Sequence, residues 1–260
     1  MPFIDQANGD KTHYITRGEG NKSILFIHGN LSNTIWWEQC MEVLPADYKA
    51  YALDLPGSGL TPETGIRHTI QYLADFVKGF VDAVGIKDLV VVGHSMGGGV
   101  SQLFTLSNPD LVKGLLLLDS MSADGFHVLY DAGEERMRKA MADYEFLTTS
   151  IKVIAPGCKD EELLKRTIDL SAKASEQVFI EQPVTMHEAN WMDRVHNITC
   201  PTLFLHGKDD HFVPQDGSER TAAAIPNCIL KYIDDCGHYP MAEQPDVFHN
   251  ELLEFISSID

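Results

Sequence analysis

The sequence predicts an α/β fold in which helices flank a mostly parallel eight-stranded sheet. Two patterns predict it. Short apolar runs alternate with amphipathic stretches along most of the 260 residues. That alternation stops between residues 120 and 195, where helical patterns occur without a convincing strand. We therefore predict a core formed by residues 1–119 and 196–260, with residues 120–195 (the insertion) forming a helical lid over the end of the sheet.

The first half of the core is expected to supply most of the strands. Residues 3–17, with Asn8-Gly9 at their centre, have the pattern of an antiparallel hairpin. The apolar run at residues 88–93 is typical of a central strand that is buried on both faces. Further strands are expected at 23–29, 48–54 and 113–119, and helices at 34–44, 66–84 and 96–107.

The second half begins with the insertion, whose helical patterns fall at residues 134–146, 160–175 and 178–192. Strands are expected to resume at residues 200–207 and 228–234, followed by a last helix at 244–256. No internal repeat or linker interrupts the chain, so the insertion is expected to be part of one folding unit.

Charge and composition exclude several classes of partner. With 38 acidic and 20 basic residues the formal charge is -18, and such a surface repels nucleic acid and anionic membranes. No apolar run approaches the roughly 20 residues that span a bilayer, and the first residues lack a signal-peptide pattern. We therefore expect a cytoplasmic protein; the sequence carries no signal of its oligomeric state.

The five cysteines indicate neither a disulfide framework nor a zinc site, because their number is odd and no CxxC pair occurs. No motif for a metal or a dinucleotide is present, so no cofactor is expected. Cys236 lies two residues before His238. We interpret it as a small buried residue, with a reactive thiol as the alternative.

The strongest chemical signal is Gly93-His94-Ser95-Met96-Gly97, a G-x-S-x-G motif between a predicted strand and a predicted helix. A sharp turn at this place lifts the serine hydroxyl out at the carboxyl end of the sheet, and the glycines remove side chains that would collide there. The amino terminus of the helix behind it offers free N–H groups to an oxyanion. Ser95 is therefore the candidate nucleophile.

With these motifs in order, the chain resembles the α/β-hydrolase superfamily, and within it the small lidded serine esterases, lactonases and cofactor-free haloperoxidase-like enzymes. The resemblance implies the α/β-hydrolase fold and extends over nearly the whole chain. Its motifs are His28-Gly29, the turn Asp54-Leu55-Pro56-Gly57-Ser58-Gly59, the motif around Ser95, His206-Gly207-Lys208-Asp209-Asp210, and Gly237-His238. Serine, aspartate and histidine follow one another in the order that this fold uses.

A serine hydroxyl needs a base within reach, and among eleven histidines only His238 stands where the family places it. The resemblance makes Asp210 the carboxylate that orients His238. Its neighbour Asp209 is expected to be a solvated loop residue. Asp119, after an earlier strand, is the second position that some family members use and stays an alternative.

The oxyanion hole is expected to come from two backbone N–H groups, those of Met96 and Asn30, with the Asn30 side chain as a further group that could bind substrate. Asp54 is interpreted as structural within its tight turn.

The predicted function is hydrolysis of a carboxylic ester or lactone through an acyl-enzyme, acting on a small neutral or apolar ester-type substrate. Alternatives on the same triad are cleavage of C–C bonds, amides or thioesters, or a ligand receptor with little turnover. Haloalkane dehalogenases and epoxide hydrolases use an aspartate where this chain has Ser95, which excludes both classes.

Overall fold

The computed structural model describes residues 2–126 and 130–259. Its eight strands form one sheet in the order β1-β2-β4-β3-β5-β6-β7-β8. The first two pair as an antiparallel hairpin, β2 also runs antiparallel to β4, and all other neighbours are parallel. The predicted mostly parallel eight-stranded sheet is confirmed. The strands are β1 (Phe3–Asp5), β2 (Lys11–Arg17), β3 (Lys22–Ile27), β4 (Tyr48–Leu53), β5 (Leu89–His94), β6 (Val112–Leu118), β7 (Thr202–Gly207) and β8 (Cys228–Ile233).

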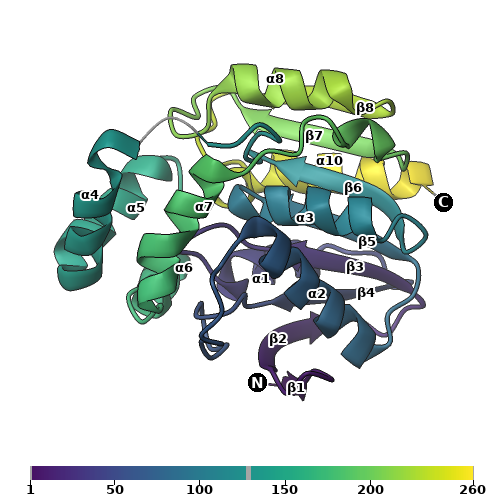
Figure 1. Cartoon of the computed structure of the whole chain (residues 1–260). Helices are drawn as coiled ribbons and strands as arrows, with labels where there is room; N and C mark the ends of the chain where they lie inside the picture. Colours follow the sequence, from purple (N-terminus) through teal and green to yellow (C-terminus); the bar gives the residue numbers. More distant parts are fainter. Residues whose placement is uncertain (1, 127–129, 260) are drawn as a thin grey trace.

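Helices cover both faces of this sheet (Figure 1). Alternate side chains of the strands divide the core into two layers, since successive residues point to opposite faces. One layer packs against α2 (Ile70–Val84), α3 (Met96–Ser107) and α8 (Gln215–Ala224). The other packs against α1 (Glu38–Glu42) and α10 (Pro245–Ile259). Strand β5 lies between β3 and β6 and is buried along its whole length, as its apolar sequence predicts.

Local capping explains where several helices differ from the prediction. Helix α2 begins at Ile70 rather than at residue 66 because the Thr69 side chain caps it by accepting from the Tyr72 N–H, and it ends at Gly85 with a φ of 78°. The predicted helix 34–44 is a 3₁₀ turn, Thr34–Trp37, followed by the short α1. The last predicted helix, 244–256, is α10, which begins at Pro245. A short helix that was not predicted, α9 (Pro240–Glu243), precedes it, and the two are separate because Gln244 lies directly before a proline, a position that disfavours helix.

In its described part the insertion is helical and contains no strand: α4 (Tyr130–Ala142), α5 (Tyr144–Ile154), α6 (Glu161–Ser171), the π-helical turn η2 (Gln177–Glu181) and α7 (Gln182–Glu188). The predicted single helix 134–146 is wrong. Asp143 caps a new helix by accepting from the N–H groups of Glu145 and Phe146. Figure 1 shows these helices beside the edge of the sheet toward which the parallel strands point. The lid role and its boundaries remain predictions.

Helix α8, between β7 and β8, was not predicted. Its buried side is made of small residues, among them Ser218, Thr221 and Ala222, so its sequence lacks the apolar stripe that marks an amphipathic helix. All five cysteines are free. Among the described helices, none is long and apolar enough to cross a bilayer.

Candidate active site

Ser95 occupies the turn between β5 and α3 with a φ of 55° and a ψ of -122°, a backbone conformation that non-glycine residues rarely adopt. Three backbone hydrogen bonds hold this turn. The Ser95 N–H donates to the Leu118 carbonyl at 3.0 Å, and the Ser95 carbonyl accepts from Gly98 at 2.9 Å and Met121 at 3.0 Å. The turn expected from the G-x-S-x-G motif is therefore present.

The two glycines of the motif are needed for close packing. A Cβ at Gly93 would lie 2.1 Å from the Ser101 Oγ, and one at Gly97 would lie 2.4 Å from the carbonyl oxygens of Ile27 and His28. Such contacts are closer than atoms can approach, so any side chain here would push the serine turn away from β3 and α3.

His238 lies on the loop after β8, and its Nδ1 donates to the Asp210 Oδ2 at 2.7 Å. The Asp210 Oδ1 accepts from the N–H groups of Phe212 at 2.7 Å and Val213 at 3.0 Å. Burial alone would raise the pKa of Asp210, but the charge of His238 and these donors outweigh burial and hold that pKa below its usual range. Asp210 is thus an ionised acceptor, and it leaves the Nε2 of His238 as the ring nitrogen available to a reacting group.

His94 links the serine turn to the histidine loop, a role that its position in the motif did not reveal. Its Nε2–H donates to the His238 carbonyl at 2.7 Å, and the two rings lie 4.7 Å apart. Burial, and then the charge of His238, keep the pKa of His94 well below its usual value, so the ring is neutral. Among the described residues no hydrogen bond joins the Ser95 Oγ to His238. The structure brings the two residues to the same edge without closing that last link.

Glu243 also fixes the histidine loop. Its carboxylate accepts from the N–H groups of Gly237 at 3.2 Å, Tyr239 at 2.9 Å and, in the insertion, Gly157 at 2.9 Å. Since Tyr239 is the residue that caps the start of α9, this carboxylate ties the start of that helix to the histidine loop. A glutamate shortly after Pro240 was the only sequence signal for it.

The two expected oxyanion donors are both free of protein acceptors in the described residues. Met96 is the first residue of α3, so its N–H has no partner within the helix. The Asn30 N–H is oriented by His28, whose Nδ1 donates to the Gly29 carbonyl at 2.7 Å while its Nε2 accepts from Leu55 at 3.0 Å. Because a trans peptide is planar, fixing that carbonyl also fixes the opposite direction of the Asn30 N–H.

The Asn30 side chain is held within the protein by its amide group. Its Nδ2 donates to the Val178 carbonyl and to the Gln182 Oε1, both at 2.7 Å, which uses both amide hydrogens and leaves only the Oδ1 as a group that could meet a substrate. Asp54 is occupied in a structural role, since its carboxylate accepts from His13, Thr34 and Leu60.

Asp119, the alternative acid, does not bind His238. It directly follows β6 with a φ of 42°, and its Oδ1 accepts from the Gly207 N–H at 2.9 Å. Its Oδ2 is buried and has no hydrogen-bond partner among the described residues. Burial, and then the charge of Asp210, raise the pKa of Asp119 well above its usual value. Asp209, as expected, is exposed.

Asp119, His206 and Asp210 are also the residues that could hold a metal, because their ligand atoms lie within 4.8 Å of one another. Asp210 already accepts three hydrogen bonds, and one of them positions His238. A cation at this place would compete with the imidazole for the same carboxylate.

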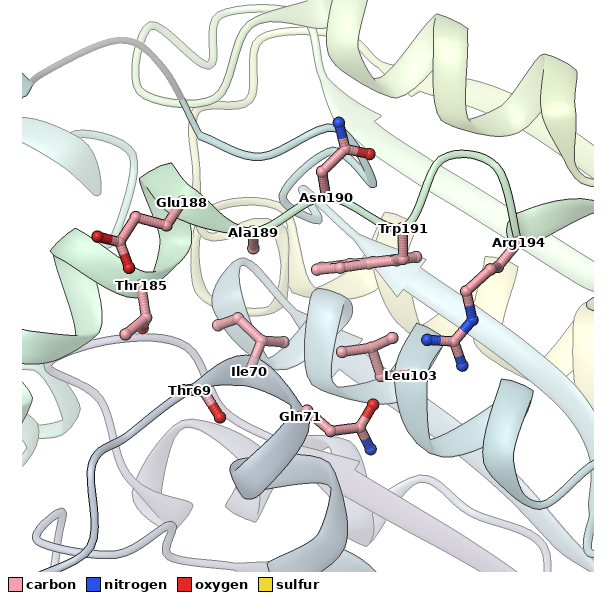
Figure 2. Close-up of a pocket in the computed structure, with 10 residues that line it drawn as sticks. All are labelled: Thr69, Ile70, Gln71, Leu103, Thr185, Glu188, Ala189, Asn190, Trp191 and Arg194. Carbon is pink, nitrogen blue, oxygen red and sulfur yellow. The ribbon is translucent and has the colours of Figure 1, made fainter.

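A separate pocket of about 280 Å³ lies between the start of α2, the middle of α3 and the segment after α7 (Figure 2). Its apolar lining includes Ile70, Leu103 and Trp191, and Glu188 and Arg194 are its charged residues. Neither Ser95 nor His238 lines it, so it is distinct from the site described above.

Comparisons with known proteins agree with the fold. Residues 24–251 match the alpha/beta hydrolase family. The chain is 26% identical to a 2-hydroxy-6-oxononadienedioate/2-hydroxy-6-oxononatrienedioate hydrolase of Dechloromonas aromatica, over 98% of this chain and 94% of that protein. In fold it is similar to an esterase from Exiguobacterium antarcticum, with a TM-score of 0.89, 21% identity and 98% of both chains covered. It is also similar to the enol-lactonase from Burkholderia xenovorans LB400, with a TM-score of 0.87, 18% identity, and 98% of this chain and 100% of that chain covered.

Proposed function

This chain belongs to the alpha/beta hydrolase family and is a hydrolase; from that premise we propose that it cleaves a carboxylic ester or lactone through an acyl-enzyme on Ser95. The observation that carries the proposal is the ionised Asp210 held at 2.7 Å from the Nδ1 of His238, at the sheet edge where the Ser95 turn emerges. This arrangement matches the roles of a serine nucleophile, a histidine base and an orienting acid.

In the proposed reaction the Ser95 Oγ attacks the substrate carbonyl while the Nε2 of His238 takes its proton. Asp210 stabilises the imidazolium that forms. The N–H groups of Met96 and Asn30 receive the negative oxygen of the tetrahedral intermediate, supported by the amino terminus of α3. His238 then returns the proton to the leaving oxygen as the carbon–oxygen bond breaks. Water repeats the sequence on the acyl-enzyme and releases the acid.

The charges around the site favour a neutral substrate. Every lysine and arginine in the described part of the chain is at least partly exposed, and none is buried. Asp210 is buried against His238, Asp119 is buried beside Asp210, and Glu243 is buried against the backbone of the histidine loop. A substrate with its own carboxylates would meet acidic groups without a buried cation to pair with, at a desolvation penalty of several kcal/mol per ion by the usual magnitudes.

Cleavage of a C–C bond next to a carbonyl is the second candidate. The relative from Dechloromonas aromatica is named as a 2-hydroxy-6-oxononadienedioate hydrolase, and it aligns over 98% of this chain. The name of its substrate describes a dicarboxylate. The absence of a buried lysine or arginine among the described residues makes this candidate the weaker one.

A substrate panel with a Ser95→Ala control tests the proposal. The panel compares neutral esters of several chain lengths, lactones, amides, thioesters and a 2-hydroxy-6-oxo-dienoate, in excess chelator and without added cofactor. We expect neutral esters or lactones to be turned over fastest, and Ser95→Ala to lower kcat/KM at least about a thousandfold with an unchanged Tm.

Near-normal turnover by Ser95→Ala would refute the nucleophile. Faster turnover of the dienoate than of every ester would favour C–C cleavage. No turnover of any panel member, together with binding, would favour a ligand receptor.

A further inference from the structure

We propose that Gln182 and His68 position the oxyanion-hole residue Asn30 through a directional chain of hydrogen bonds that runs through the insertion to Glu63. The inference rests on the proposed function, because it concerns the N–H group of Asn30 that would stabilise the oxyanion. It adds two positioning residues, neither of which touches the reacting atoms.

The first link joins Asn30 to the insertion. Its side-chain amide donates to the Gln182 Oε1 and to the Val178 carbonyl, each at 2.7 Å. The Val178 carbonyl is available because it lies in the π-helical turn η2, where its partner five residues later would be Pro183, which has no N–H. A proline in the insertion thus provides an acceptor for the oxyanion loop.

The second link has only one consistent direction. The Gln182 Oε1 accepts from Asn30, so the Nε2 of Gln182 must be the donor to the Nδ1 of His68, 3.2 Å away. With Nδ1 as an acceptor, His68 carries its hydrogen on Nε2. That atom lies 3.0 Å from the Glu63 Oε1 and donates to it. Both Gln182 and His68 are fully buried, so water cannot replace these partners without opening the structure.

Glu63 ends the chain as a charged acceptor. Its Oε2 accepts from the Ser175 Oγ at 2.6 Å, and its Oε1 also accepts from the N–H groups of Thr64 at 2.8 Å and Gly65 at 3.1 Å. Burial would raise the pKa of Glu63, but the Ser175 hydroxyl, His68 and the two amides outweigh it and keep that pKa below its usual value. Ser175 belongs to the insertion, so the series of hydrogen bonds from Asn30 to Glu63 has a contact with the insertion at both of its ends.

The other groups around His68 do not offer an alternative route. Its backbone N–H donates to the Glu181 Oε2 at 3.2 Å, and its backbone carbonyl accepts from the Thr185 Oγ1 at 2.7 Å. The Tyr72 ring stacks on the imidazole with 6.0 Å between the ring centres. The charged groups that face it are therefore Glu63 and Glu181. Thr185 holds the insertion to the same loop without belonging to the chain.

Two anchors consequently fix the Asn30 N–H. His28 holds the preceding carbonyl, and the Gln182 chain holds the side chain of the same residue. The second anchor requires the Nδ1 of His68 to be an acceptor. An N–H at that position would face the Nε2 of Gln182, and a flip of that amide would then present its NH₂ group to the NH₂ group of Asn30.

Variants of Gln182 test the proposal on a neutral ester. Gln182→Met removes both hydrogen bonds at similar size. We expect it to lower kcat by about tenfold to hundredfold, less than or equal to the loss of a whole oxyanion donor, with KM changed less than about twofold. The matched control is Thr185→Val, which removes a contact between the insertion and the same loop but leaves the chain intact. We expect its kcat to stay within about threefold of wild type.

Gln182→Glu distinguishes positioning from packing, because it keeps an acceptor for the Asn30 amide at the same side-chain size, whereas Gln182→Met keeps only the size. We expect the kcat of Gln182→Glu on a neutral ester to lie closer to wild type than that of Gln182→Met, with the KM of both changed less than about twofold. Equal losses of kcat in the two variants would show that the acceptor for Asn30 does not matter.

A double-mutant cycle of Asn30→Ala with Gln182→Met completes the test, because residues acting through one contact give non-additive losses. We expect the double variant to lose no more than the larger single loss. Three results would each overturn the proposal. The first is a wild-type kcat in Gln182→Met, the second is a loss of kcat in Thr185→Val as large as that in Gln182→Met, and the third is a pair of losses that multiply in the cycle. If Gln182→Met does not fold, Asn30→Ala decides, and a normal kcat in that variant overturns the proposal. Near-normal turnover by Ser95→Ala would instead refute the proposed function.

Discussion

The ends of β6 and β7 carry two buried carboxyl groups in contrasting environments. Asp210, after β7, accepts three hydrogen bonds, and its pKa lies below the usual range. Asp119, after β6, accepts one, and its pKa lies well above that range. Two neighbouring carboxyl groups in a buried site rarely ionise together, so the one with more donors keeps the charge. That comparison identifies Asp210 as the partner of His238.

Local backbone structure explains the difference. Asp119 directly follows its strand, and its N–H still donates to the Leu205 carbonyl of β7 at 2.9 Å, which leaves few free donors nearby. Asp210 lies in a loop whose next residues, Phe212 and Val213, turn their N–H groups back to its side chain. A short loop after a strand can therefore stabilise a carboxylate where the strand end itself cannot.

The largest expected effect is that of Asp210→Asn. It should lower kcat/KM on a neutral ester by about ten-thousandfold, because His238 loses both its tautomer and its counter-charge. Steady-state kinetics at neutral pH, with Tm to establish folding, measures it.

Asp119→Asn should have a much smaller effect on the same reaction, within about tenfold of wild type. The amide keeps an acceptor for Gly207 and, like the protonated acid, carries no charge toward Asp210. If Asp119→Asn were inactive and Asp210→Asn active, the assignment of the two acids would have to be exchanged.

The smallest expected effect is on stability, and it has opposite signs at the two positions. The pKa of Asp119 is higher in the folded state than in the unfolded chain, where it is about 3.9. Its contribution to stability is therefore complete below about pH 3.9 and is lost as the pH rises through the pKa of the folded state. The stability of Asp119→Asn relative to wild type should therefore increase between about pH 4 and the raised pKa of Asp119. Each kcal/mol of difference in the free energy of unfolding should raise the Tm difference by about 2–4 °C.

Asp210 has a lowered pKa in the folded state, so its stability contribution is present above about pH 3.9 and is lost as the pH falls through the folded value. The destabilisation of Asp210→Asn should accordingly be largest at neutral pH and decrease in acid. Thermal melts of both variants across pH 3–8 measure the pair. Parallel curves would show that the two carboxyl groups do not differ as described.

The core could be predicted from its sequence because each buried strand is a short apolar run that ends in a recognisable motif. The helices were harder to delimit where side chains decide their ends. Asp143 starts a new helix within the predicted 134–146, and α8 has no apolar stripe. Residues 127–129 of the insertion lie outside the described part of the chain.

The residues of the site divide in the same way. Ser95 follows from its local motif, and the resemblance to the family implies Asp210 and His238 at their strand ends. The sequence did not indicate the contacts of Glu243, Gln182 and His68, because these join segments far apart in the chain, such as Gly157 and Glu243 or Asn30 and Gln182. The sequence also placed Asp119 and Asp210 at the same edge, but only their donors distinguish them.

Covalent labelling tests the central claim most directly. Wild-type protein and both asparagine variants are treated with an aryl phosphonate, and the modified peptide is identified by mass spectrometry. We expect one adduct, on Ser95, formed at similar rates in wild type and Asp119→Asn and far more slowly in Asp210→Asn. An adduct on another residue, or no adduct in a protein that still hydrolyses esters, would contradict it.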